Sequence, residues 1–82
     1  MTRREAEGII AQALLEKIEG DVYPSATQMD MVEQLLTPEL TQEYLGVLMD
    51  KVMGDTMPSI PMLRRMIRIA GTLPVAELPR GR

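Results

Sequence analysis

The segment from Pro38 to Met53 constrains the fold of this chain more than any other. It opens with Thr37-Pro38-Glu39, a strong helix start: the Thr37 hydroxyl can cap free backbone N–H groups, proline suits the first helical position, and Glu39 meets the positive end of the helix dipole. At 3.6 residues per turn, apolar side chains cover more than half of the helix circumference: Leu40, Tyr44, Leu45, Val47, Leu48, Met49, Val52 and Met53. A helix this apolar needs cover on several sides, which three other helices or a second copy of the protein would supply.

The size of the chain makes additional stabilisation necessary. Its 82 residues are enough for one small domain. Such a domain buries only about 60–65% of its unfolded surface and is marginally stable without help. Cysteine is absent, which excludes disulfides and zinc–thiolate sites, so oligomerisation is the remaining helper. We therefore expect a homodimer or larger homo-oligomer.

The distribution of charge and hydropathy bears on partners and location. The chain has neither an apolar run of membrane-spanning length nor a signal-peptide pattern, so we expect a soluble cytoplasmic protein with no membrane partner. The net charge of −3 argues against general affinity for nucleic acid. The charge is uneven, however. Residues 16–55 carry nine acids and two lysines, whereas the chain after Asp55 carries five arginines and one acid.

Capping signals predict the remaining helices. Thr2 and Glu5 form a capping box, Ser25 begins a second one, and Ser59 can cap a further helix. Together with the glycines that follow three of the apolar segments, these signals predict helices over residues 3–19, 26–36, 38–53 and 60–70. The predicted fold class is all-α: a compact four-helix domain over residues 1–78 with an extended C-terminal tail. Residues 79–82 are expected to be a disordered end of this tail.

The apolar periodicity also predicts which face of each helix is buried. In the first helix the expected stripe is Ile10, Leu14 and Ile18, widened by Ala11 and Leu15, with Ile9 and Ala13 on another side. In the second, the inward residues are Met29, Val32, Leu35 and Leu36, and those facing water are Asp30, Glu33 and Gln34. In the fourth, the apolar side is Leu63, Met66, Ile67 and Ala70, and the opposite side is Arg64, Arg65 and Arg68.

A weak internal echo accompanies this pattern. Pro24-Ser25 and Pro58-Ser59 are 34 residues apart, and each pair opens a helix. This is the period of tetratricopeptide arrays, but the signature residues of those repeats are missing. We interpret the echo as two similarly capped helices.

The residue types that carry most catalysis are lacking. Histidine is absent, which removes the commonest general base and the commonest transition-metal ligand. The glycines are too scattered for a phosphate-binding loop, and Ser25 and Ser59 serve as caps. The carboxylate pairs Asp30/Glu33 and Glu39/Glu43 are interpreted as solvated acidic faces rather than cation sites. The sequence thus predicts no enzyme activity, no catalytic residue, no cofactor and no metal.

The arginine face of the fourth helix is the sharpest functional feature. We take Arg64, Arg65 and Arg68 as candidate partner-binding residues. One interpretation is that they pair with the acidic faces of the second and third helices, within the chain or across a dimer. A second is that they bind an acidic protein. A third is DNA contact in a helix-turn-helix-like arrangement, although the turn from Gly54 to Pro58 is longer than usual for that motif.

Two short stretches carry a resemblance to a known group. At Tyr23-Pro24-Ser25, and at Met57-Pro58-Ser59-Ile60-Pro61-Met62-Leu63-Arg64-Arg65-Met66, the chain resembles small orphan α-helical proteins of actinobacteria and their phages. The resemblance covers about half of the chain and implies no catalytic residue. It implies a small protein that binds and redirects a host protein.

These observations favour a non-enzymatic protein-binding module, as a phage-encoded or bacterial modulator of a host protein in the cytoplasm. A DNA-binding regulator that uses residues 60–70 is the alternative from a different class. A self-assembling structural oligomer is a further alternative.

Overall fold

A computed structural model describes residues 1–75, which contain four helices and no strand. The helices are α1 (Arg3–Gly20), α2 (Ala26–Glu33), α3 (Pro38–Met53) and α4 (Ile60–Ala70). The predicted all-α class and four-helix composition are confirmed. The predicted domain boundary at residue 78 and the disorder predicted for residues 79–82 lie outside the described residues.

Helix α2 ends three residues earlier than predicted, at Glu33 instead of Leu36. The reason lies in the start of the next helix. Pro38 disfavours helical geometry at the residue before it, and Thr37 is extended, with φ −97° and ψ 168°. The chain therefore has to leave the helix before Thr37, and Gln34 and Leu35 form a turn closed by a 2.9 Å hydrogen bond from Leu35 N–H to the Val32 carbonyl.

The predicted cap residue accepts a hydrogen bond at every helix start, but the capping box predicted at Ser25 forms only in part, because Gln28 Oε1 has no hydrogen-bond partner among the described residues. At α1, the Glu5 backbone N–H donates to Thr2 Oγ1 at 3.1 Å, and the Thr2 N–H donates to Glu5 Oε1 at 2.9 Å. The hydrogen bonds from the Thr2 backbone N–H and side chain lower the pKa of the Glu5 carboxyl. The hydroxyls of Ser25, Thr37 and Ser59 each accept a bond from the third residue beyond. These bonds satisfy backbone donors that the first turn of a helix leaves open.

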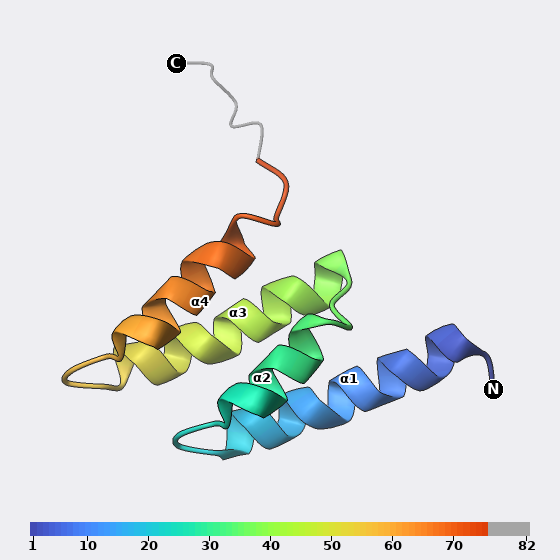
Figure 1. Cartoon of the computed structure of the whole chain (residues 1–82), viewed down its shortest axis with the longest axis horizontal. Coiled ribbons are helices and arrows are strands. Elements are labelled where there is room, and N and C mark those ends of the chain that lie inside the picture. The colour runs from blue at the N-terminus through green and yellow to red at the C-terminus, as the bar shows by residue number, and fades with distance from the viewer. Residues whose placement is uncertain (76–82) are drawn as a thin grey trace.

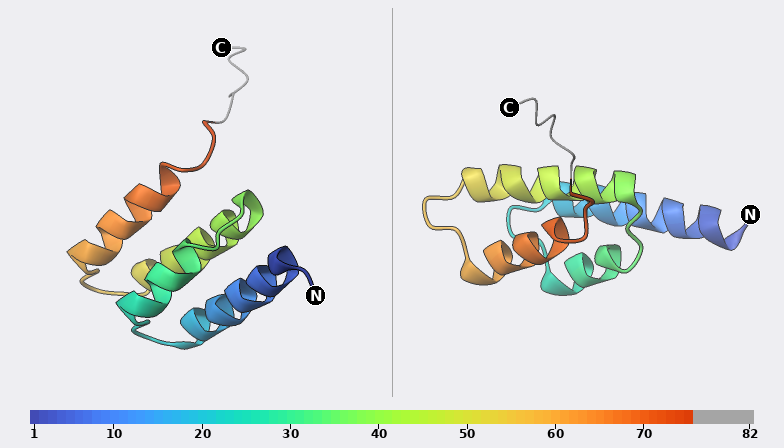
Figure 2. Two further views of the ribbon diagram at one scale, coloured as in Figure 1. Left: turned by 45° about the vertical axis from the view of Figure 1, so that its right-hand side comes forward. Right: turned by 90° about the horizontal axis from the view of Figure 1, so that it is seen from above.

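The helices form two antiparallel hairpins, α1–α2 and α3–α4, which lie side by side (Figure 1). Seen from above, α1 and α3 form one layer and α2 and α4 the other (Figure 2). The connections within both hairpins lie at the same end of the molecule. The sequence echo at a 34-residue spacing is interpreted as two similarly capped helices. In the structure the repeat is larger, because whole hairpins follow one another in the same order.

The core lies between the two layers. Its buried apolar residues come from all four helices: Ala11, Leu15, Ile18, Met29, Val32, Tyr44, Leu45, Leu48 and Ile69. Helices α1 and α3 contribute three of these residues each, and α3 also buries Thr41, whose hydroxyl donates to the Thr37 carbonyl at 2.8 Å. One face of α3 is therefore buried, as its sequence predicts. Its other face is open: Met49 is 46% and Met53 is 85% exposed.

The buried face of α1 contains Ala11, Leu15 and Ile18 from the predicted face, but Ile10 is 52% exposed, so that face is shifted towards Ala11 and Leu15. Helix α4 is turned about its axis relative to the prediction, since Ile69 is buried and Ile67 is 73% exposed. This rotation brings Arg65 towards α2, as described below.

The burial pattern predicts a gradient of mutational sensitivity. Leu45 and Leu48 are 4% and 0% exposed, so replacing either with alanine should lower the free energy of unfolding by about 2–5 kcal/mol. Leu73→Ala should cost about 1 kcal/mol or less, since Leu73 is only half-buried at the edge of the core. Chemical denaturation followed by circular dichroism measures all three. Equal losses at the three positions would contradict this placement of the core.

Candidate functional site

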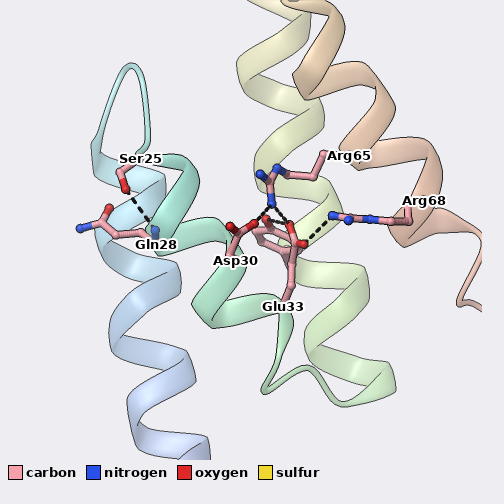
Figure 3. Close-up of polar contacts among 7 residues, drawn as sticks. Ser25, Gln28, Asp30, Glu33, Arg65 and Arg68 are labelled. Carbon is pink, nitrogen blue, oxygen red and sulfur yellow. Dashed lines mark hydrogen bonds and ion pairs between the residues drawn. The ribbon is translucent and has the colours of Figure 1, made fainter.

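Two of the three candidate arginines form ion pairs with helix α2 (Figure 3). Arg65 Nη1 donates to Asp30 Oδ1 and to Glu33 Oε2, both at 2.7 Å. Arg68 Nη2 donates to Glu33 Oε1, also at 2.7 Å. This is the intramolecular pairing that we considered for the arginine face. The prediction that Glu33 faces water is wrong, because its side chain is only 11% exposed. The Arg65 side chain is 15% exposed.

A tyrosine of the core completes this arrangement. The hydroxyl of Tyr44, which is fully buried on α3, donates to Glu33 Oε2 at 2.6 Å. The Glu33 carboxylate therefore accepts bonds from α3 and α4 while it belongs to α2. We call Asp30, Glu33, Tyr44, Arg65 and Arg68 the carboxylate network. It connects the first hairpin to the second through charge-assisted hydrogen bonds, the stronger class of such bonds.

The network changes the acidity of two of its members. Burial raises the pKa of the Tyr44 phenol, and its hydrogen bond to the Glu33 carboxylate raises it further. Burial alone would lower the pKa of the Arg65 guanidinium. The hydrogen bonds and charges of Glu33 and Asp30 outweigh that effect and raise it. At neutral pH the network thus contains a neutral phenol and a charged guanidinium.

Arg64 is placed differently. It is exposed and makes no ion pair with any residue in the described part of the chain. Arg68 keeps 61% of its side chain exposed while it pairs with Glu33. The three arginines therefore do not form one free cationic face, and partner binding by them stays a prediction that now concerns Arg64 most directly.

A groove opens between the α1–α2 connection and the α3–α4 connection, and we call it the loop-end groove. Its volume is about 300 Å³. It is lined mostly by apolar side chains from both hairpins: Val22, Tyr23, Pro24, Ala26, Met29, Val52, Met57, Pro61 and Met62. At its mouth the large side chains are open to solvent, with Val22 75%, Tyr23 84% and Met57 87% exposed.

The side chains of Lys51 and Arg65 fix the positions of the elements that line this groove. Lys51 Nζ donates to the backbone carbonyls of Glu19, at 3.0 Å, and of Asp21. It thereby attaches the end of α1 and the start of the α1–α2 connection to α3, and its charge lies at the negative end of the α1 dipole. Arg65 also lines the groove, and the carboxylate network fixes its guanidinium. The groove is therefore formed by positioned elements rather than by loops alone.

The loop-end groove suits the binding of apolar side chains. Among residues 1–75, no group of three or more His, Cys, Asp or Glu side chains is placed to hold a metal ion. Asp30 and Glu33, which we weighed as a cation site, share Arg65 as their cation. The loop-end groove is a concave, methionine-containing apolar surface, a kind of surface that can adapt to different apolar side chains.

The sequence pattern does not predict the contacts of three residues at this site. It places Glu33 in solvent, because Glu33 shares a polar strip of α2 with Asp30 and Gln34. Tyr44 was treated as apolar only, although a buried tyrosine hydroxyl usually finds a partner and so signals a polar contact in the core. Lys51 stands in the last turn of α3, and no local feature of the sequence points to α1 as its partner.

Comparison with protein-family models, with curated proteins and with solved structures gave no match in any of the three. The resemblance to small actinobacterial and phage proteins is therefore neither supported nor opposed by them. In the described part of the chain, none of the helices combines the length and apolar character required to span a bilayer.

The carboxylate network predicts unequal effects of removing two neighbouring arginines. Arg65→Met keeps an apolar stem but leaves Glu33 short of a partner, so it should lower the free energy of unfolding by about 3 kcal/mol. Arg64→Met is the matched control and should change it by less than about 0.5 kcal/mol, since Arg64 is exposed. Urea denaturation of both variants measures the difference. If both variants lowered the free energy of unfolding by a similar small amount, the carboxylate network would contribute little to stability.

The raised pKa of Tyr44 in the folded protein predicts a loss of stability at alkaline pH. Because folding raises its pKa, the folded protein holds the phenol proton more tightly than the unfolded chain does. The resulting contribution of Tyr44 to the free energy of unfolding is fully present below the pKa of the phenol in the unfolded chain, about 10, and is lost as the pH rises above that value. In a Tyr23→Phe background, Tyr44 is the one remaining tyrosine. Phenolate absorbance should then appear together with the loss of helical circular dichroism, whereas phenolate in a folded protein would contradict the buried hydrogen bond.

Proposed function

We propose that this protein is a small non-enzymatic protein-binding module, and that the loop-end groove is its binding site. The groove receives an apolar side chain or a short apolar segment of another protein. The observation that carries the proposal is the exposure of Tyr23, Val22 and Met57 around an apolar concavity of about 300 Å³. Exposed apolar surface rimmed by polar groups is typical of protein interaction sites.

The groove has the character of an anchor pocket. Tyrosine and methionine are enriched at protein interfaces, where tyrosine provides a large contact area with few rotatable bonds. Lys51 and Arg65 fix the walls through bonds to α1 and α2, so little conformational entropy is lost when a partner binds. Asp55 and Ser59 add polar groups that can orient the bound segment.

This proposal moves the predicted contact surface. The sequence predicts partner binding by Arg64, Arg65 and Arg68, but Arg65 and Arg68 form ion pairs with Glu33 inside the chain. Arg64 remains available at the surface of α4, the helix that contributes Pro61 and Met62 to the groove. A host protein in a bacterial or phage-infected cytoplasm is the partner class that the Pro-Ser and Leu-Arg-Arg resemblance suggests. The DNA-binding alternative gains no support from the ion pairs of Arg65 and Arg68.

Affinity capture with matched variants tests the proposal. Tyr23→Glu and Met57→Glu each place a charge at the mouth of the groove on a highly exposed residue, so neither should lower the melting temperature appreciably. Lysine is avoided in these variants so that no basic patch is created. Random-peptide display on the immobilised protein should enrich sequences with an apolar anchor, and capture from a bacterial lysate should retain a specific protein.

The variants decide where that binding occurs. Both should lose the enriched peptides and the captured protein, while a control with the same change on α1, Ile9→Glu, should keep them, because Ile9 is exposed outside the groove. Retention by the groove variants would contradict the assigned site. Capture of duplex DNA, lost on Arg64→Ala, would instead support the regulator.

A further inference from the structure

A hollow lined by three arginines lies beside the loop-end groove. Its volume is about 220 Å³, and its walls are Pro61, Arg64, Arg65 and Arg68 of helix α4. We call it the cationic hollow. Pro61 and Arg65 also line the loop-end groove, so the two concavities share a wall. A segment bound in the groove is therefore within reach of the arginines.

The three arginines differ in how far other residues of the chain satisfy them. Arg65 is held by its bonds to Asp30 and Glu33. Arg68 reaches Glu33 through Nη2, and 61% of its side chain stays exposed (Figure 3). Arg64 is exposed and has no ion pair within residues 1–75. In this part of the chain the three guanidinium groups meet only two carboxylates, so one positive charge is left uncompensated at the hollow.

The geometry of the uncompensated charge suits a carboxylate. Arg64 and Arg68 are four residues apart, so they lie on the same side of α4. A guanidinium group presents several N–H donors in a planar fork that matches the two oxygens of a carboxylate. Arg68 uses one nitrogen for Glu33. Its other donors and those of Arg64 can therefore bind the oxygens of a single acidic side chain.

The small extent of the charge favours a protein over a nucleic acid as the source of this anion. Asp30 stands beside Arg65 with 60% of its side chain exposed, and the whole chain has a net charge of −3. Nucleic acid presents a row of phosphates, and binding it needs a comparable row of cations. One positive charge beside an apolar groove matches one acidic side chain beside an apolar side chain.

We propose that the loop-end groove and the cationic hollow together bind an acidic peptide segment of a partner protein. The apolar anchor of the segment occupies the groove, and an Asp or Glu side chain lies between Arg64 and Arg68. This inference rests on the function proposed above and adds the chemistry of the partner. Because the two concavities share a wall, and three extended residues span about 10 Å, the acidic residue lies within about three positions of the anchor.

Matched peptides test this chemistry. Peptides enriched by display on the immobilised protein should carry Asp or Glu within about three positions of the apolar anchor. The commonest enriched peptide is compared with a version that has the corresponding amide, Asn or Gln, at the acidic position. In fluorescence anisotropy at low salt, the acidic peptide should bind about five-fold more tightly, as expected for a partly exposed ion pair. The difference should fall below about two-fold at high salt, which screens the pair.

Variants of Arg64 locate the contact. Arg64→Gln should lower the affinity for the acidic peptide to that for the amide peptide. Arg64→Glu should reverse the preference, because two carboxylates would then meet. Arg4→Gln, an identical change on an exposed residue of α1 that lines neither concavity, is the matched control and should keep the preference.

The outcomes separate this inference from the proposed function. Equal binding of the two peptides, with both lost in Tyr23→Glu, would overturn the acidic contact and leave the groove standing as the binding site. A preference that survives Arg64→Gln would also overturn the contact. Displacement of the acidic peptide by duplex DNA, lost in Arg64→Gln, would assign the hollow to nucleic acid instead. Display that enriches no apolar anchor would contradict both the groove and the acidic contact.

Discussion

The arrangement of the two hairpins depends on the hydrogen bonds that the carboxylate of Glu33 accepts. Its side chain is 11% exposed, and it accepts bonds from Tyr44, Arg65 and Arg68. Removing a carboxylate from water costs several kcal/mol, which is offset only when both oxygens are well bonded. Helix α4 must therefore turn its arginines towards α2. That rotation decides which apolar residues of α4 enter the core and which stay outside, and it also places Arg65 in the wall of the groove.

The groove that we propose as a binding site follows from this rotation. With Arg65 directed at Asp30 and Glu33, Met62 and Pro61 come beside the α1–α2 connection and complete the loop-end groove. The opposite side of α4 keeps Ile60 and Ile67 exposed. An ionic contact inside the chain thus creates apolar surfaces at its edge. A polar network of this kind fixes one arrangement of helices where apolar packing alone would permit several.

The sequence was informative about local structure and less so about orientation. The capping residues Thr2, Ser25, Thr37 and Ser59 located all four helix starts because their bonds are local. The faces of α4 could not be assigned in the same way. Met62, Met66 and Ile69 form one apolar side, Leu63, Ile67 and Ala70 form another, and helical periodicity permits either to be buried. The choice depends on contacts between Arg65 and residues 30 and 33, which are more than thirty positions away in the chain. The groove was missed for the same reason, since its two walls come from different hairpins.

Native-state hydrogen exchange on the wild type and on Glu33→Gln tests most directly whether Glu33 joins the hairpins into one unit. In the wild type, the slowest amides of α1–α2 and α3–α4 should exchange with the same free energy, as expected for one cooperative domain. In Glu33→Gln, which keeps the shape of the side chain but removes its charge, the amides of α4 should exchange well before those of α1. An unchanged exchange pattern in the variant would contradict the account.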